Sequence, residues 1–298
     1  MDRLPDIRRS NPCSEDNDRL IERYIKQKSI PGSPLSILEA GCGQTWWLNL
    51  DPVPYVLCGV DIDRKALEIR KYQKGDLHET VEGDLRTVEL GDRQFDVIFC
   101  SFVLEHVDEA DLVLKNFVRW LKPGGLLIVR VPDRDSVRGF ITRMTPHWFH
   151  VLFYKLVLGR EKAGQPGYGP YATFFHPWVS RRGMYRYCEA FGFSVKEEHG
   201  EHESDGEGLM GAMIGLVTKV GATLSLGKLT ARHTNLLYIL EKAPAADAAE
   251  PARSAARRAE SVTASMPRRE GSRDDRVLRR RRRRGRSSEA RPPAPSRS

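Results

Sequence analysis

Short apolar runs alternate with amphipathic segments through the first half of the chain. Four apolar runs have the length of strands, at 36–40, 56–60, 95–100 and 124–131, and a weaker one lies at 79–82. Between them, residues 63–72 and 109–121 place apolar side chains at helical spacing. Strands that are apolar throughout and are joined by helices are typical of a parallel sheet covered on both faces. The pattern therefore predicts an α/β fold.

The flanking segments extend this prediction. A helix is expected over 14–27, with Ser14 as its N-cap, and a proline-rich turn ends it. After Pro132 the pattern is less regular: 133–179 is rich in aromatic side chains and His, and 206–227 is glycine-rich and apolar. A further helix is predicted over 180–191, and two last strands over 193–199 and 235–241.

Composition separates a tail from the rest of the chain. Residues 243–298 hold 16 Arg, no Lys and seven acidic residues, so the tail carries +9 and residues 1–242 carry −1 of the net +8. All 25 aromatic residues precede the tail, which has too little to bury to offset the entropy of ordering. The predicted parts are an N-terminal helical segment at 1–34, one domain at 35–242 with cap insertions at about 133–179 and 200–233, and a disordered Arg/Ala/Pro-rich tail at 243–298.

Several classes of protein are disfavoured. No run of 18 apolar residues is free of charge, so no transmembrane segment is expected. The first residues lack the apolar run of a signal peptide, and the five cysteines form no CxxC pair, which argues against a zinc ribbon or a disulfide scaffold. A reducing cytoplasm is the expected compartment.

A glycine pair follows the first strand of the predicted domain. Glu39 closes that strand, and Gly41-Cys42-Gly43 is expected to form a turn that opens a helix, whose first N–H groups are free to meet a ligand. A dinucleotide fingerprint needs a small residue where Trp46 stands, which disfavours a nicotinamide or flavin enzyme.

Acidic residues also end the next two strands. Asp61 lies 22 residues after Glu39, at a position from which a carboxylate can accept two hydrogen bonds from a ribose diol. Its alternative role is that of a helix N-cap. Asp84 follows the third strand.

Two further segments complete a set of motifs, Leu104-Glu105-His106-Val107 and Leu121-Lys122-Pro123-Gly124-Gly125. In this order and spacing the chain resembles the class I S-adenosylmethionine-dependent methyltransferases, over roughly residues 35–242. The resemblance implies a Rossmann-like three-layer sandwich whose seven-stranded, mostly parallel sheet has an antiparallel last strand. It also implies S-adenosyl-L-methionine as cofactor.

The resemblance assigns a cofactor site. It implies that Glu39 lies near the methionine amino group, that Gly41, Cys42 and Gly43 underlie the cofactor, and that Asp61 holds the ribose. The rest of the implied cofactor-binding set is Ile62, Asp84 near the adenine amino group, Leu85 on the ring, and Ser101 and Phe102 in the methyl-donor pocket. Thr45 departs from the family pattern, which often has glycine there.

The acceptor side is less defined. His106 is a candidate general base, with packing or capping at a helix start as its alternative. The candidate acceptor-binding residues of the cap are His147, Trp148, Tyr171 and His176. His147 and His150 have the spacing of two metal ligands, but no third ligand is specified, so no metal is predicted. For the apolar runs 148–158 and 209–226, packing against the body is favoured over an acceptor pocket or a membrane contact.

The sequence thus predicts a cytoplasmic methyltransferase for a small-molecule, lipid-like or glycan-linked acceptor. Oxygen or carbon methylation is favoured, because Cys100-Ser101-Phe102-Val103 is not the Asn/Asp-Pro-Pro-aromatic motif that orients an amine. The alternatives are a nucleic-acid methyltransferase docked by the tail and a non-catalytic S-adenosylmethionine-binding module. The tail's arginines suit nucleic acid or an anionic membrane, although no aromatic residues accompany them to stack on bases.

Overall fold

The computed structural model describes residues 7–9, 14–156, 159–165, 169–202, 208–226 and 228–244. The tail predicted from 243 onward lies outside these ranges beyond residue 244, and the side chain of the predicted N-cap Ser14 is also outside the description.

One sheet organises the described residues, with the strand order β1-β7-β8-β6-β5-β2-β3-β4. β8 is antiparallel to both of its neighbours, and every other pair is parallel. This confirms the predicted mostly parallel sheet with an antiparallel last strand, to which the two-residue β1 adds an eighth strand at the edge. The strands are β1 (Arg8–Arg9), β2 (Leu35–Ala40), β3 (Tyr55–Asp61), β4 (Glu79–Glu82), β5 (Phe95–Ser101), β6 (Leu121–Pro132), β7 (Phe193–Glu201) and β8 (Asn235–Lys242).

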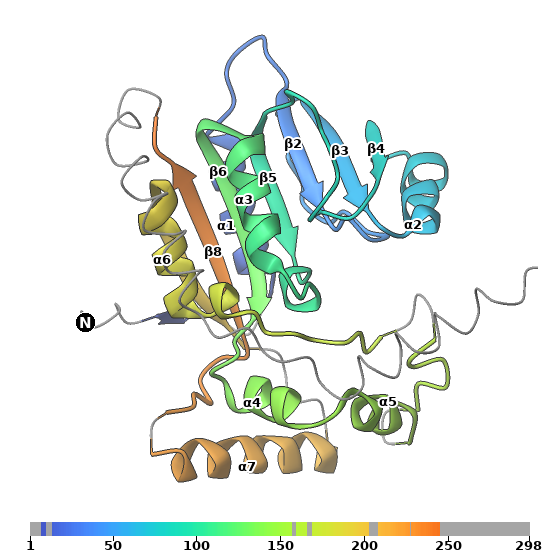
Figure 1. Cartoon of the computed structure of the whole chain (residues 1–298), viewed down its shortest axis with the longest axis vertical. Helices are drawn as coiled ribbons and strands as arrows, with labels where there is room; N and C mark the ends of the chain where they lie inside the picture. Colours follow the sequence, from blue (N-terminus) through green and yellow to red (C-terminus); the bar gives the residue numbers. More distant parts are fainter. Residues whose placement is uncertain are drawn as a thin grey trace, which may run out of the picture. The chain divides into compact units, whose positions relative to one another are not determined.

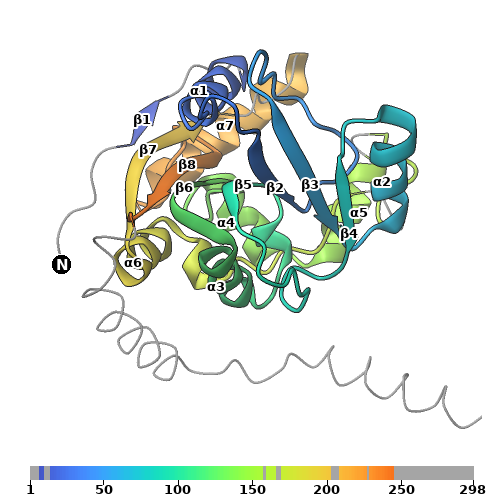
Figure 2. The ribbon, with the colours of Figure 1, turned by 90° about the horizontal axis from the view of Figure 1, so that it is seen from above.

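Helices cover both faces of the sheet. Viewed along the sheet, α1 lies on one face and α3 and α6 lie on the other (Figure 2). The helices are α1 (Ser14–Lys26), α2 (Arg64–Glu68) with its π-helical continuation η1 (Ile69–Lys74), α3 (Ala110–Trp120), α4 (Val137–Met144), α5 (His147–Leu156), α6 (Arg181–Phe191) and α7 (Gly208–Leu224). Two 3-10 turns are η2 (Leu104–His106) and η3 (Pro177–Val179).

The helix expected after the glycine turn does not form. Residues 41–54, all of them described, contain no helix. From Trp46 onward the segment is extended, and alternate side chains, Leu48 and Leu50, are buried in the core beside α1. Pro52 and Pro54 would end a helix here, because proline lacks a donor and disfavours helical backbone in the residue before it, and the alternating burial before them suits an extended chain. The expected helix is therefore wrong, and an extended segment covers this part of the sheet instead.

The two predicted cap insertions contain α4, α5 and α7, which lie beyond the end of the sheet where β6 finishes (Figure 1). The expectation that their apolar runs pack against the body is met only in part: α7 packs on α4, and several α5 side chains are half-buried. α5 buries no side chain, and large apolar side chains of α7 face solvent, such as Leu216 at 62% exposure. Within the described ranges, no helix combines the length and the apolar character needed to cross a membrane.

Candidate cofactor and acceptor site

The predicted cofactor residues meet at one edge of the sheet. β2, β3 and β5 are parallel neighbours in register, with Ala40 beside Val60 and Glu39 beside Phe99. The loops that leave their carboxyl ends therefore begin side by side. The predicted cofactor residues Gly41–Gly43, Asp61 with Ile62, and Ser101 with Phe102 stand at these three strand ends. The sheet therefore brings them together.

Asp61 fixes the glycine turn. Its Oδ2 accepts a hydrogen bond from Gly43 N at 2.8 Å, and its Oδ1 accepts from Asp63 N at 2.8 Å. The N-cap of α2 is Asp63, which accepts from the N–H groups of Lys65 and Ala66, so the N-cap alternative for Asp61 is wrong. Asp61 instead joins the end of β3 to the turn that follows β2.

The two glycines of the turn have different surroundings. Gly41 has φ +71°, and a Cβ there would come within 2.3 Å of Val103 Cγ2. Gly43 has φ +52°, but a Cβ there would meet nothing within 4 Å. Gly41 is therefore required by packing, whereas Gly43 presents bare backbone to open space at the strand edge.

Glu39 is not free at the end of β2. Its Oε2 accepts a hydrogen bond from Arg70 Nη2 at 2.8 Å, and both side chains are buried. Arg70 also donates to the Cys42 carbonyl at 2.8 Å and to Asp76 at 2.7 Å. Burial raises the pKa of Glu39 to about 7, and the Arg70 charge opposes that rise.

Arg70 is not among the residues predicted from the sequence, although a signal for it is present. Arg70 follows Ala66 and Leu67 at the helical spacing of three to four residues, so it shares their buried face. A fully buried arginine on such a face needs an acidic partner, and Glu39 is that partner.

Asp84 has a partner that the sequence did not indicate. Arg86 donates to both Asp84 oxygens at 2.6–3.1 Å, and this contact lowers the pKa of Asp84. Leu85 between them is buried, and its carbonyl accepts from Asn116 at 2.9 Å. The carboxylate predicted for the adenine amino group is therefore held by a guanidinium.

Polar and apolar groups at the end of β5 suit a cofactor with an adenosyl moiety. Ser101 Oγ is buried and has no hydrogen-bond partner among the described residues. Phe102 has φ +56° and is 39% exposed, and Ile62, which follows β3, is 75% exposed. An orphaned hydroxyl, the carboxylate of Asp61 and exposed apolar side chains fit the residues predicted to hold S-adenosylmethionine.

The buried Arg130 lies next to Phe102 at the end of β5. The Arg130 guanidinium lies 5.9 Å from the Phe102 ring centroid. It donates to Glu201 at 2.6 Å and to Asp18 at 2.9 Å. This cluster connects α1, β6 and β7 next to the predicted methyl-donor pocket, and no local pattern in the sequence indicates it.

His106 is held in one tautomer. Its Nδ1 lies 2.9 Å from the Ala172 carbonyl, which can only accept, so Nδ1 carries the proton and Nε2 keeps its lone pair. Burial lowers the pKa of His106, which favours the neutral ring. The Tyr171 ring lies edge-on to it at 5.6 Å.

Glu105, the neighbour of His106, is an unusual carboxyl group. It is buried, its Oε2 has no hydrogen-bond partner within the described part of the chain, and burial raises its pKa to about 8. Its Oε1 lies 3.8 Å from His106 Nε2. Burial therefore favours the protonated, neutral form of Glu105, which places no negative charge beside His106 Nε2.

The candidate acceptor residues do not all meet. Tyr171 contacts His106, and His176 caps η3 by accepting from Trp178 N at 3.4 Å. His147 and Trp148 lie on α5, and no described contact brings them to His106. In the described residues, no cluster of three or more His, Cys, Asp or Glu side chains could hold a metal ion.

The sheet order and the strand-edge site define a Rossmann-like domain of the class I methyltransferase type. Residues 9–198 match the family model described as "Methyltransferase domain", and the chain belongs to that family. This assignment confirms the resemblance on which the site was predicted, and S-adenosylmethionine is the cofactor that goes with it.

Known proteins with similar sequences include a demethylmenaquinone methyltransferase of Staphylococcus saprophyticus, 29% identical over 36% of this chain and 48% of its own length. A ubiquinone biosynthesis O-methyltransferase of Coxiella burnetii is 24% identical over 54% of this chain and 68% of its own length. The chain thus spans about half of the first relative. An S-adenosylmethionine dependent methyltransferase from Mesorhizobium loti aligns with a TM-score of 0.45 at 16% identity, over 74% of this chain and 96% of that one.

Proposed function

We propose that the protein transfers a methyl group from S-adenosylmethionine to an oxygen or carbon atom of a small, lipid-like or glycan-linked acceptor. The observation that carries the proposal is the meeting of Asp61, Gly43 and Ser101 at the ends of three adjacent parallel strands. Ligands of open α/β sheets bind outside the carboxyl ends of the strands.

Each cofactor residue has a separate role in this proposal. Asp61 accepts from the ribose diol while its hydrogen bond to Gly43 keeps the turn in place. Ile62 and Leu85 supply apolar surface for the adenine ring, and the free Ser101 hydroxyl binds a polar group of the cofactor. Glu39 acts through Arg70, which connects it to the Cys42 carbonyl in the same turn.

The bound cofactor supplies a methyl group already activated by its sulfonium. The protein must then align the acceptor, exclude water and take up any proton that the acceptor loses. His106 Nε2 is the group that accepts this proton, because Ala172 keeps the ring in the tautomer with that lone pair free. Tyr171, edge-on to His106, borders the acceptor.

An apolar acceptor is supported by the surroundings of His106. Phe102 and Phe174 are exposed on the segments next to it, and the Phe174 N–H donates to the Glu105 carbonyl at 2.8 Å. The names of the relatives, demethylmenaquinone and ubiquinone biosynthesis methyltransferases, support a small apolar acceptor of the quinone kind.

Calorimetry of the full chain with S-adenosylmethionine, S-adenosylhomocysteine and NAD in parallel tests the cofactor. We expect the two sulfur compounds to bind and NAD not to bind. A panel of phenol, quinol and sugar acceptors with radiolabelled methyl donor then tests the transfer. Tight binding of both sulfur compounds without turnover of any acceptor would favour the non-catalytic module.

A further inference from the structure

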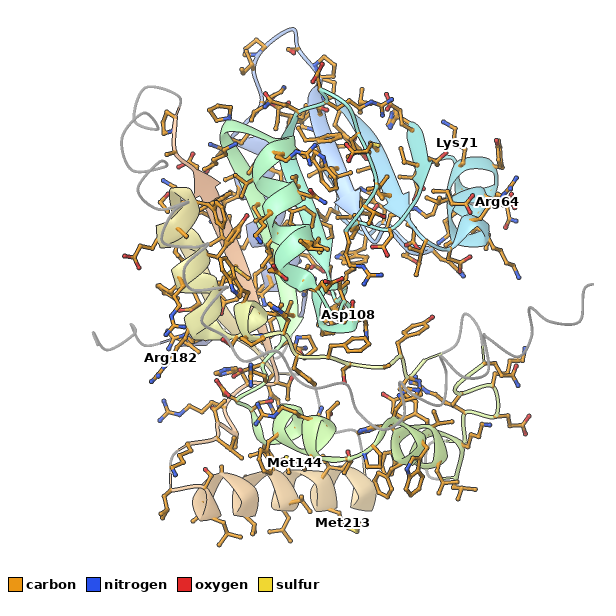
Figure 3. All side chains as sticks on the ribbon, in the orientation of Figure 1. Arg64, Lys71, Asp108, Met144, Arg182 and Met213 are labelled. Atoms are coloured by element: carbon orange, nitrogen blue, oxygen red, sulfur yellow. The ribbon has the colours of Figure 1, made fainter. Side chains whose placement is uncertain are left out.

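Most of the large apolar side chains described on α7 face solvent. On the opposite side Gly211 and Thr218 are buried, and Gly221 and one large apolar side chain, Ile214, are half-buried. The solvent-facing stripe, at the spacing of one helical face, is large, apolar and 47–76% exposed: Met213, Leu216, Val217, Val220 and Leu224. Figure 3 shows Met213 on the side of α7 that faces away from the sheet.

Two other cap helices repeat this arrangement. α5 exposes Trp148, Phe149, Leu152 and Leu156, which share one helical face, at 44–74%. α4 exposes Phe140, Ile141 and Met144 at 37–66%. α4 packs on α7, since a Cβ on Gly221 would lie 2.9 Å from Val137 Cγ1. Twelve large apolar side chains on three neighbouring helices are thus exposed to solvent. Single exposed apolar side chains are common on proteins, but a group of this size indicates an interaction surface. We name this set the apolar cap face.

Basic residues accompany the apolar cap face. Residues 134–165 and 208–232 together hold nine Lys or Arg and two acidic residues, a net charge of +7, whereas the remainder of residues 1–242 carries −8. Three acidic positions, 203, 205 and 207, precede α7 and lie outside the described residues. The positive charge of the domain is therefore concentrated on the segments that expose the apolar side chains.

We propose that the apolar cap face docks on the surface of a membrane that contains anionic lipids. Amphipathic helices with aromatic and leucine side chains on one face and Lys or Arg beside them lie in the plane of a bilayer interface in this way. Charge disfavours the other occupants. A second copy placed cap to cap would bring two +7 surfaces together, and the chain's own tail carries +9.

Flotation of the full chain with vesicles tests the proposal. The vesicles are phosphatidylcholine alone, or phosphatidylcholine with phosphatidylglycerol as about a third of the lipid. We expect binding to the anionic vesicles that weakens with added salt. The triple variant Met213→Ser, Leu216→Ser, Val220→Ser should bind at least roughly tenfold more weakly, since each buried methylene group contributes to insertion.

Controls separate this surface from the rest of the chain. The double variant Ile30→Ser, Tyr72→Ser removes two side chains that are 66% and 80% exposed outside the cap, and it should bind like the unmodified protein. Vesicles with brominated acyl chains should quench the fluorescence of the unmodified protein, and Trp148→Phe should lose most of that quenching while it stays bound. This readout does not depend on the folding of the triple variant.

Two outcomes would overturn the proposal. Equal binding of the triple variant and the unmodified protein would assign the attraction to the arginine-rich tail. A dimer in light scattering that the triple variant abolishes, without vesicle binding, would make a second copy the occupant. Because the assay contains no methyl donor, its result is independent of the proposed methyl transfer.

Discussion

Arg70 Nη2 donates to Glu39 Oε2 at 2.8 Å, although 31 residues separate the two side chains in sequence and both are buried. A second nitrogen of the same guanidinium donates to the Cys42 carbonyl. Arg70 thus connects the end of β2 to the turn that follows it. The geometry of the glycine turn depends on a side chain from η1, outside the recognised motifs.

Replacement of Arg70 by Met should destabilise the protein by about 3–5 kcal/mol, because it removes the buried partner of Glu39 and the donor to the Cys42 carbonyl. Urea unfolding followed by circular dichroism measures this. The exposed pair of Arg64 and Glu68 provides the matched control, and Arg64→Met should change the stability far less than Arg70→Met. The double variant Glu39→Gln, Arg70→Met should be more stable than Arg70→Met alone. If Arg70→Met and Arg64→Met lower the free energy of unfolding equally, the buried ion pair stabilises the protein no more than the exposed one.

The two glycines of the turn should respond differently to alanine. Gly43→Ala meets open space, so it should cost only the about 1–2 kcal/mol of a left-handed residue with a Cβ. Gly41→Ala places a Cβ within 2.3 Å of Val103, so it should cost more, and Val103→Ala should recover part of the loss. S-adenosylhomocysteine titrations provide the second readout. Gly43→Ala should weaken S-adenosylhomocysteine binding by more than its small loss of stability explains. An unchanged affinity would show that the cofactor does not contact Gly43.

The sequence predicted most of the sheet because each strand end carries a local signal. The runs that became β3, β5 and β8 are apolar and bounded by polar residues, so burial on both faces was readable from composition alone. The extended segment after Gly43 also has a local pattern: Trp46, Leu48 and Leu50 alternate with the exposed Trp47 and Asn49. The expectation of a helix rested on the glycine turn instead.

The sequence predicted the site residues that end strands, but not the side chains that bind to them or pack beside them. Asp61 and Ser101 could be placed because each ends a strand, and the sheet brings those ends together. The contacts of Arg70 with Glu39 and of Arg130 with Glu201 join residues 31 and 71 positions apart. Such pairs depend on the register of packed elements, which a local pattern does not contain.

Asp61→Ala should weaken the binding of S-adenosylhomocysteine by about 1–3 kcal/mol, the usual effect of removing one partner of a buried hydrogen bond. The free energy follows from calorimetry of the folded variant. Asp63→Ala is a suitable control, because it removes the α2 cap next to the site without removing the proposed ribose acceptor. Equal losses in the two variants would mean that Asp61 acts only through the local backbone.

His106→Gln should lower the rate of methyl transfer by roughly 10²–10⁴-fold for an acceptor that must lose a proton. It should leave S-adenosylhomocysteine affinity unchanged, because the proposed role of His106 is toward the acceptor. Turnover against pH with the best acceptor of the panel is the measurement. If the dependence of turnover on pH keeps its shape in the variant, His106 is not the general base and has only a packing or capping role.

Glu105 should make the stability of the protein fall as pH rises. Its folded pKa is raised to about 8 by burial, above the ordinary value of 4.5, so between these values the folded state holds a proton that the unfolded state has lost. This contribution is fully present below about pH 4.5 and is lost as pH approaches 8, with a slope of roughly 1.4 kcal/mol per pH unit. Glu105→Gln keeps the shape of the side chain and removes the titration.

The free energy of unfolding of both proteins, measured by urea between pH 5 and 9, isolates this effect. The variant and the unmodified protein should be close in stability near pH 5, and the variant should become the more stable one toward pH 8. Glu39, whose pKa is also raised, contributes equally to both proteins and cancels in the difference. A difference that is constant across this range would show that Glu105 is ionised in the folded protein, and that the lone pair of His106 faces a charge rather than a neutral acid.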